Sequence, residues 1–320
     1  MLAFIVRRVI GAIIAMFFVT FASFLLLNIS PIDPAVVAIY VRELPVVTEE
    51  TIAAMREDLG LNDPFFVRYW RWLVSIFTLD LGTSWNNQTR LITEELRRAF
   101  PYTATLSAVG LLFTLLLAVP LGILSAIFKD SLVEKVTRVL FFAGSSIPNY
   151  FLALLLIWLF SVHLRWLPSG GVGTFGHYVL PGISLAMVYS VSLARLLRNN
   201  ILDNMKESYV LYGRARGLSE TSLICKHVFK NSLQSTMTAV GFAIVGLLSG
   251  TVVIESIFSI PGLGRLSISA IFNRDFPMIQ AYVLIVGFLF VFVNLIVDIA
   301  QCLVDPRLKK GQIDGQSASV

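Results

Sequence analysis

The densest group of chemically active side chains in this sequence is a basic segment, residues 195–230. It carries seven Lys and Arg residues, and Gly213 and Gly217 stand on either side of Arg214-Ala215-Arg216. Ser219 is a residue type that caps helix N-termini. An apolar stripe at helical spacing follows, made of Ile224, Cys225, Val228 and Phe229. The pattern predicts short helices around a glycine-permitted bend, able to present a rigid knob to a partner. The alternative is a basic loop that only signals topology.

Motifs for catalysis or for phosphate binding are absent from the sequence. It contains no GxxxxGK[ST] loop, no HExxH, no GxSxG and no CxxC pair. The three histidines are scattered, at His163, His177 and His227. The two cysteines, Cys225 and Cys302, are too few for a metal site of their own. We therefore expect no catalytic residue, no metal site and no cofactor bound by this chain, which leaves a channel, a transporter or a receptor.

The distribution of apolar residues predicts the elements that carry these side chains. Hydrophobic residues make up 56% of the 320 residues and charged residues 14%, and the mean hydropathy is +0.79. Six stretches of 22–30 residues contain no Asp, Glu, Lys or Arg: residues 9–32, 99–128, 139–164, 166–194, 231–254 and 276–297. A hydrocarbon core of ~30 Å needs about 20 helical residues. The sequence therefore predicts an all-α polytopic membrane protein with six transmembrane helices.

The positions of Lys and Arg orient these helices. With the N-terminus inside, 15 of the 25 basic residues lie in cytoplasmic segments, and seven of the other ten lie in one long segment, residues 30–98. Long translocated segments count little in the positive-inside rule. Both termini are therefore expected to be cytoplasmic. The net charge of +5 is then a topology signal rather than a sign of nucleic-acid binding.

The spans divide the chain into four segments. These are 1–30, the N-terminus and first transmembrane helix; 31–100, an extracytoplasmic element; 101–305, a core of five transmembrane helices with a cytoplasmic loop at about 200–232; and 306–320, a cytoplasmic tail. In the extracytoplasmic element, Thr48 opens a helical pattern that Leu59-Gly60 closes, and Asp63-Pro64 starts an aromatic-rich helix. Residues 79–84 are typical of a turn, and residues 258–279 are expected to form a re-entrant or external helix. The 31–100 element either packs on the membrane interface and helix ends or receives substrate.

Two prolines mark where the spans can bend. Pro120 interrupts the second span and Pro148 the third, and each removes a helix hydrogen bond and permits a kink. Ser146 and Asn149, next to Pro148, are able to satisfy the freed carbonyls or to line a pathway. For Asn149, lining the pathway and bonding a neighbouring helix are equal alternatives.

Two acidic residues lie near the ends of spans. Glu255 is close to the outer end of the fifth span and Asp298 to the inner end of the sixth, and acids in membranes tend to face a cavity or a partner. The alternative for Glu255 is a salt bridge with Arg265 or Arg274. The alternative for Asp298 is snorkelling toward the cytoplasmic basic residues. The candidate pathway residues are Ser146, Pro148, Asn149, Glu255 and Asp298.

Short motifs follow one another in a recognisable order between the spans. They are Asp33-Pro34, Leu59–Pro64, Leu81–Ser84, Pro101–Leu106, Ser146–Asn149, Leu167-Pro168, Ala215–Leu218, Pro261–Gly264, Asn273–Asp275 and Asp305–Arg307. In this order they resemble, over nearly the whole chain, the inner-membrane permease subunits of bacterial ABC importers, in the dipeptide/oligopeptide/nickel branch. The resemblance implies a type I importer permease fold, a multi-pass location in the bacterial inner membrane, and a transport subunit that is not itself an enzyme.

The resemblance also assigns a role to the basic loop. Binding-protein-dependent permeases share a cytoplasmic loop of the form Glu-Ala-Ala, three residues, Gly, and Gly217 is similar to that glycine. Leu211-Tyr212-Gly213 stands at the Glu-Ala-Ala positions, a departure consistent with the peptide/nickel branch, which lacks the acidic start. The implied ATPase-coupling loop consists of Leu211, Gly213, Arg214, Ala215, Arg216, Gly217, Leu218 and Ser219.

The family implies partners and a substrate class. The partners are a second homologous permease, two cytoplasmic ATPases that bind ATP and Mg, an extracytoplasmic binding protein and membrane lipid. Residues 209–212, 227–231 and 269–277 look closest to nickel and metal-chelate permeases, so the expected substrate is nickel, passing as a chelate. A dipeptide or oligopeptide is the alternative. A secondary transporter or a membrane enzyme is a different-class alternative, but the sequence shows neither inverted halves nor clustered acids at helix ends.

Overall fold

The structure, a computed structural model, is almost entirely helical. It describes residues 2–29, 33–42, 44, 47–86 and 89–304, so the tail predicted at 306–320 lies outside the described residues. Within them the only β-type pairing is one isolated bridge between Thr83 and Leu91. The chain forms two compact units, which are described separately. The 7–103 unit comprises Arg7–Thr103 and Pro261–Phe292, and the 104–260 unit comprises Met1–Val6, Ala104–Ile260 and Val293–Val320.

The 7–103 unit is built from five helices and the first parts of two long ones. They are α1 (Leu2–Asn28), α2 (Pro34–Val41), α3 (Glu49–Asp58), α4 (Phe65–Phe77), α12 (Leu263–Phe272), and the starts of α5 (Ile92–Ile127) and α13 (Phe276–Val304). α5, α12 and α13 meet in an apolar cluster around Ile92, Leu263 and Met278. A second cluster packs α2 against α3, with Ile39 and Trp85 at its centre.

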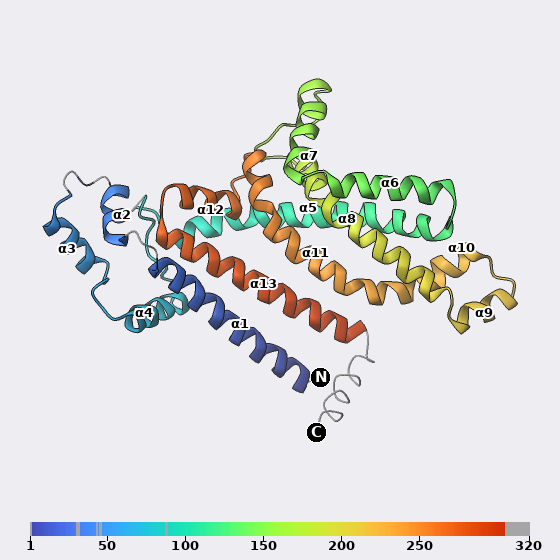
Figure 1. Ribbon diagram of the computed structural model, residues 1–320, viewed down its shortest axis with the longest axis horizontal. Coiled ribbons are helices and arrows are strands. Elements are labelled where there is room, and N and C mark those ends of the chain that lie inside the picture. Colours follow the sequence, from blue (N-terminus) through green and yellow to red (C-terminus); the bar gives the residue numbers. More distant parts are fainter. Residues whose placement is uncertain (1, 30–32, 43, 45–46, 87–88, 305–320) are drawn as a thin grey trace. The chain divides into compact units, whose positions relative to one another are not determined.

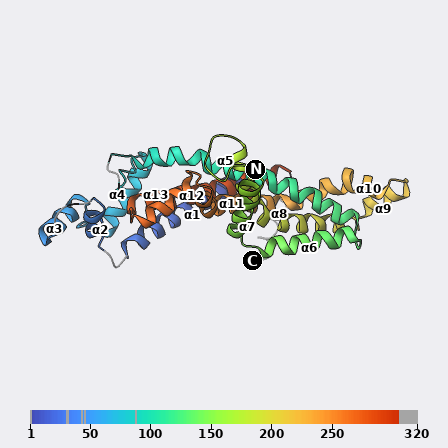
Figure 2. The same cartoon turned by 90° about the horizontal axis from the view of Figure 1, so that it is seen from above.

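The 104–260 unit holds the remaining helices. They are α6 (Leu132–Ser146), α7 (Asn149–Leu156) with a π-helical continuation η1 (Ile157–His163), α8 (Gly176–Asn204), α9 (Ser208–Ala215), α10 (Glu220–Leu223), a π-turn η2 (Ile224–Val228) and α11 (Phe229–Ile257). α8 and α11 pack along each other, and α6 and α7 pack on α8 (Figure 1). In both views α9 and α10 form the end of this unit beyond α8 (Figure 2).

Among the described residues, five helices are long and apolar enough to cross a membrane. They are Val6–Leu25, Ile92–Ile127, Gly176–Asn204, Thr236–Ile257 and Phe276–Ala300, and they match five of the six predicted spans. The prediction for the third span, residues 139–164, is wrong in its start. α6 ends at Ser146, and a separate apolar helix covers Asn149–His163, a length of about 22 Å at ~1.5 Å per residue.

Pro148 explains this break. It occupies the N-cap position of α7 with ψ 137°, and Ile147 before it is extended, with ψ 122°, as expected for a residue that precedes proline. The predicted kink inside a continuous span is therefore corrected to a stop and a restart. Pro120 does lie inside α5 as predicted, and α8 contains a further internal proline, Pro181, that sequence analysis did not single out.

The predicted extracytoplasmic helices are confirmed at their ends. Thr48 caps α3 and forms a capping box with Thr51, and Gly60, directly after the C-cap of α3, has a φ of +62°. α4 begins directly after Pro64. Helix α2 was not predicted, although Asp33 accepts a hydrogen bond from the Ala35 N–H at its start and Pro34 occupies the favourable first helical position.

A buried carboxylate joins two motif segments of the 7–103 unit. Asp275 is 3% exposed and accepts hydrogen bonds from the Ser84 hydroxyl, from the Trp85 N–H at 3.3 Å and from the Met278 N–H at 3.3 Å. It thereby caps α13 while it holds the turn predicted at residues 79–84. That turn contains positive φ angles at Leu79 and Gly82.

Candidate functional site

The predicted coupling loop folds as α9 and α10 joined by a tight turn. The Gly217 N–H donates to the Arg214 carbonyl at 2.9 Å, and the Leu218 N–H donates to the Gly213 carbonyl at 3.2 Å. This pair of bonds is the Schellman pattern that closes a helix C-terminus. Gly217 has a φ of +79°, a conformation that costs side chains with a Cβ free energy. The predicted bend is therefore confirmed.

The two helices are fixed to the unit by close packing. Ser219 caps α10 by accepting from the Ser222 N–H at 3.3 Å, as predicted. A Cβ on Gly213 would lie 2.5 Å from the Cδ2 atom of Leu223, so any larger residue at this position would require the Leu223 side chain to move. Three residues of the predicted apolar stripe pack in one cluster with residues of α8 and α9: Ile224 and Val228 are buried, and Phe229 is partly buried. Unlike the prediction, α10 does not end but continues through η2 into α11.

We refer to α9, the turn and α10, residues 208–223, as the α9–α10 knob. Its exposed side is apolar and basic. Leu211 and Tyr212 are 67% and 71% exposed, and Leu218 is also exposed. Arg214 forms a two-point ion pair with Glu220, with Nε–Oε1 at 2.6 Å and Nη2–Oε2 at 3.1 Å. The bonded carboxylate raises the pKa of Arg214. The pair bridges the turn, and the arrangement presents a fixed shape with a partly apolar surface.

The predicted pathway residues lie in three separate places in the chain. Ser146, Pro148 and Asn149 lie at the break between α6 and α7. Glu255 is fully buried in α11, and Asp298 is half-buried in α13. Their roles in a pathway stay predictions.

Sequence analysis missed a buried ion-pair network between α6 and α8. The Glu134 side chain is 4% exposed, and its Oε1 atom accepts hydrogen bonds from Arg138 at 2.9 Å and from Arg198. Its Oε2 atom accepts from the Asp130 N–H at 2.6 Å. One signal was present in the sequence: Ser131 and Glu134 have the spacing of a capping box. The partner on α8, 64 residues away, had no such signal.

The charge of Glu134 is set by these contacts. Burial alone would raise the pKa of Glu134, but the Asp130 N–H, the Arg138 hydrogen bond and the Arg198 charge together hold it below its usual range. The carboxylate is therefore kept ionised, and it ties the turn between α5 and α6 to α8.

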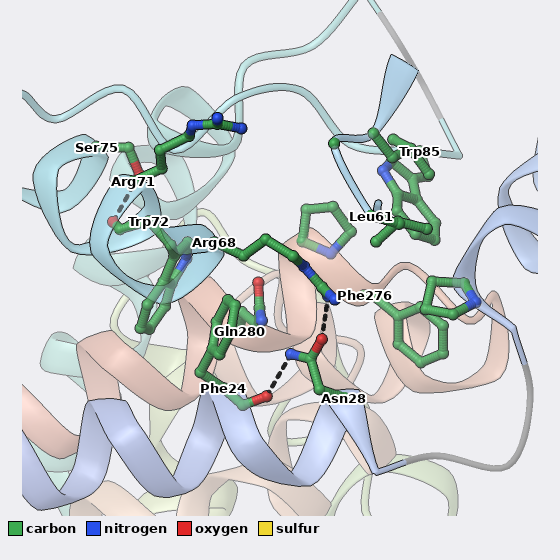
Figure 3. A pocket seen from close by; sticks show the side chains of 14 residues that line it. Phe24, Asn28, Leu61, Arg68, Arg71, Trp72, Ser75, Trp85, Phe276 and Gln280 are labelled. Carbon is green, nitrogen blue, oxygen red and sulfur yellow. Dashed lines mark hydrogen bonds between the residues drawn. The ribbon is translucent and has the colours of Figure 1, made fainter. Parts of the chain in front are cut away.

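The 7–103 unit contains a cavity of about 350 Å³ between α1, α4 and the start of α13 (Figure 3). Its polar wall includes Arg68, which donates to the Asn28 side-chain carbonyl and lies 5.9 Å from the Phe24 ring centre. Burial lowers the pKa of Arg68, and the charge of Asp63 partly offsets this. Its apolar wall includes Trp72 and Trp85. A guanidinium beside indole rings can hold a small group that carries a carboxylate.

Among the described residues, five apolar helices of spanning length indicate a polytopic membrane protein. The comparisons with known proteins agree. Residues 118–310 match the profile of the binding-protein-dependent transport system inner membrane component, and residues 1–107 match the N-terminal membrane component of such systems. The chain belongs to this family: it is an inner-membrane permease subunit of an ABC importer, a multi-pass protein of the bacterial inner membrane.

Relatives of known name match over nearly their full length. A Brucella abortus (strain 2308) protein with the provisional name peptide transport system permease protein is 36% identical, over 97% of this chain and 99% of the relative. The glutathione transport system permease protein GsiC of Salmonella paratyphi A is 32% identical over the same shares. A solved structure titled as an inward-facing conformation of the MetNI methionine ABC transporter matches at a TM-score of 0.58. It is 16% identical and covers 66% of this chain and 96% of that chain, which shows the type I importer permease fold.

Proposed function

We propose that this permease carries short peptides across the inner membrane. The proposal is supported by the two relatives named for peptide and for glutathione transport, because each matches 97% of the chain without a large insertion or truncation. Glutathione is itself a tripeptide. The expectation of nickel rested on three short stretches of sequence, and nothing in the names of these relatives refers to nickel.

We further propose that the α9–α10 knob is the point where free energy enters the permease. The chain has no phosphate-binding loop, so energy must come through contact with partner ATPases. ATP binding would close the ATPases and draw the knobs of two permeases together, and hydrolysis would reset them. This is alternating access as a two-state equilibrium that a ligand biases. The exposed Leu211 and Tyr212 side chains suit insertion into a groove of the ATPase.

The cargo is tested by uptake in cells whose own peptide and nickel importers are deleted. The complete importer, with this chain and its partner subunits, is expected to support uptake of radiolabelled di- and tripeptides that disappears when this chain alone is omitted. Uptake of radioactive nickel, offered free or chelated, is measured in the same cells. Nickel uptake without peptide uptake would contradict the peptide proposal.

The coupling role is tested separately in the same cells. Cysteines placed at Leu211 and Tyr212 are expected to cross-link to an ATPase subunit, whereas a cysteine at the exposed Glu57 of α3 should give no such product. Absence of cross-links from both knob positions, in a complex that still transports, would remove the knob as the contact.

A further inference from the structure

Helix α4 has two apolar faces, and the residues that the structure describes cover only one of them. Phe65, Tyr69 and Trp72 pack against phenylalanine rings of α1. The second face is an exposed stripe at positions i, i+4, i+8 and i+11, formed by Phe66, Trp70, Val74 and Phe77. These four side chains are between 45% and 86% exposed. A helix that faces water would carry polar residues there.

The polar residues of α4 are gathered on a third strip. Arg68, Arg71 and Ser75 follow one another at helical spacing, and all three line the cavity shown in Figure 3. Arg71 is paired with Asp63 at 2.6 Å. The three faces of α4 therefore have different surroundings. One face packs against α1, one lines the polar cavity, and one is exposed and carries no charged side chain.

The contacts of α4 with α1 place this side of α4 beside the apolar span of α1. The Tyr69 hydroxyl lies 3.0 Å from the Thr20 hydroxyl, and the Tyr69 ring lies 5.5 Å from the Phe21 ring. Thr20 and Phe21 are inside the apolar span Val6–Leu25. Thr20 precedes the end of that span by five residues, or about 7.5 Å along a helix axis. The side of α4 that touches α1 is thus below the end of the hydrophobic span, not above it.

We infer that α4 is an interfacial helix whose exposed stripe is embedded in lipid. It would lie at the end of the membrane reached by the C-terminus of α1, which is the outer leaflet in the predicted orientation. Phe17 and Phe18 of α1 are also exposed within the apolar span, so α1 and α4 both present apolar side chains that no described residue covers. Tryptophan residues such as Trp70 are enriched at the membrane–water interface. An amphipathic helix that lies in this interface buries its apolar face among the lipids.

This surface has a structural consequence for the cavity. Because the apolar stripe of α4 is anchored in lipid, the polar side of the same helix is held at the membrane boundary and faces away from the lipid. This polar side is formed by Arg68, Arg71 and Ser75. The polar cavity, whose lining includes Phe24 of the span as well as Arg68, is then held at the same boundary. The lipid contact follows from the exposed stripe of α4 and from the contacts of α4 with α1, and it does not depend on the cargo.

The test measures the surroundings of the stripe in the complete importer, reconstituted in phosphatidylcholine vesicles. Single cysteines replace Phe66 or Trp70 after Cys225→Ser and Cys302→Ser, and each carries a nitroxide label. Collisions with oxygen, which concentrates in lipid, are compared with collisions with a water-soluble nickel chelate. Phe18→Cys in the span is the lipid reference, and Glu57→Cys, exposed on α3, is the water reference.

The oxygen-to-chelate collision ratio at Phe66 and Trp70 is expected to be several-fold higher than at Glu57 and close to that at Phe18. A ratio equal to that at Glu57 would mean that the stripe faces water and would overturn the inference. Low accessibility to both reagents would mean that a protein partner covers the stripe, and this would overturn it as well. The two stripe positions provide independent readings, so failure of one variant to assemble leaves the other decisive.

Discussion

At the scale of single residues, Gly217 connects backbone geometry with the proposed function, because its conformation shapes the proposed coupling loop. Its φ of +79° closes α9, and no atom outside its immediate neighbours lies within 4 Å of the place where a Cβ would stand. A substitution there therefore changes backbone preference without filling occupied space. Any effect of such a substitution can therefore be attributed to backbone strain in the turn and not to steric clashes with neighbouring residues.

Gly217→Val is expected to strain the turn by on the order of 1 kcal/mol or more and to reduce transport strongly. Gly217→Asn is the matched control, because asparagine tolerates a positive φ, and it should retain most of the transport. The assay is uptake by the complete importer, with stimulation of its ATPase activity by loaded binding protein as a second readout. Equal transport by the Val variant and the wild type would remove the turn from the coupling mechanism.

The residues that sequence analysis placed correctly are those whose roles depend on near neighbours. The caps at Thr48 and Ser219 and the turn at Gly217 each need only contacts within a few residues. The Glu134–Arg198 pair connects residues 64 positions apart, and no local pattern specifies which arginine a carboxylate will meet. The same limit applies to Asp275, whose partners Ser84 and Trp85 lie far away in sequence.

At the scale of elements, the Glu134 network joins α6 to α8. The depressed pKa of Glu134 means that, at a pH near 4, the unfolded chain binds more protons than the folded chain does. The stability contributed by this group is therefore fully present above its ordinary pKa of about 4.3 and is lost as the pH falls through the folded value. The network should hold α6 firmly at neutral pH and loosen as the pH falls below the ordinary pKa of a glutamate.

Glu134→Gln is expected to lower stability by about 1.5–3 kcal/mol at pH 7, because two arginines lose a charged acceptor. The loss should shrink as the pH approaches and passes below 4. Thermal unfolding of the purified protein in detergent, followed at several pH values, measures both effects. Glu57→Gln, at an exposed carboxylate, is the control and should show neither. A pH-independent difference for Glu134→Gln would refute the assigned ionisation.

The loop that precedes α8 is in close contact with Phe258, at the end of α11, through Gly170 and Gly171. A Cβ on Gly170 would lie 2.5 Å from the backbone carbonyl oxygen of Phe258, to which the Gly171 N–H donates at 2.7 Å. Backbone atoms cannot move aside as a side chain can. This contact therefore fixes the loop to the end of α11.

Gly170→Ala is expected to cost about 1–3 kcal/mol, the usual range for forcing an extra group into a packed site. Gly176→Ala is the matched control, since its Cβ would make only ordinary contacts, the nearest at 3.5 Å. The comparison of Tm values for the two variants in detergent decides the matter. Similar Tm values for the two variants would show that the loop can accommodate the extra methyl group without loss of stability.

The elements themselves were largely predictable because span length and charge-free composition are properties of the sequence. The third span was the exception. Its charge-free stretch is continuous, but Pro148 stops one helix and starts another, so apolar length overstated helix length. Helix α2 was missed for the opposite reason: eight residues make too short a pattern to be distinguished from a loop.

At the scale of the whole molecule, the charge distribution predicts both termini in the cytoplasm. A reporter enzyme fused after residue 85 is expected to be active only outside the cytoplasm, and one fused after residue 210 only inside. Paired reporters, one active on each side of the membrane, make the result independent of expression level. Reversal at either position would invert or break the predicted topology, and with it the access of the α9–α10 knob to ATPases.

The family could be recognised from the order of short motifs, but the cargo could not. The nickel expectation came from a few residues that differ little between branches. In the proposed mechanism a permease supplies a path and a coupling surface, and we expect a separate binding protein to select most of the cargo. The relatives therefore carry more information about the cargo than any side chain identified in the sequence.

The bond between Ser84 and Asp275 also has a consequence for the order of biosynthesis. The two residues are 191 positions apart, and translation at about 5–20 residues per second separates their synthesis by roughly 10–40 s. During that interval the segment around Ser84 and Trp85 has left the ribosome without its buried acceptor and without the α13 cap. The nascent chain therefore passes through a stage in which Ser84 and Trp85 lack the Asp275 carboxylate, and this contact can form only after residue 275 has been synthesised.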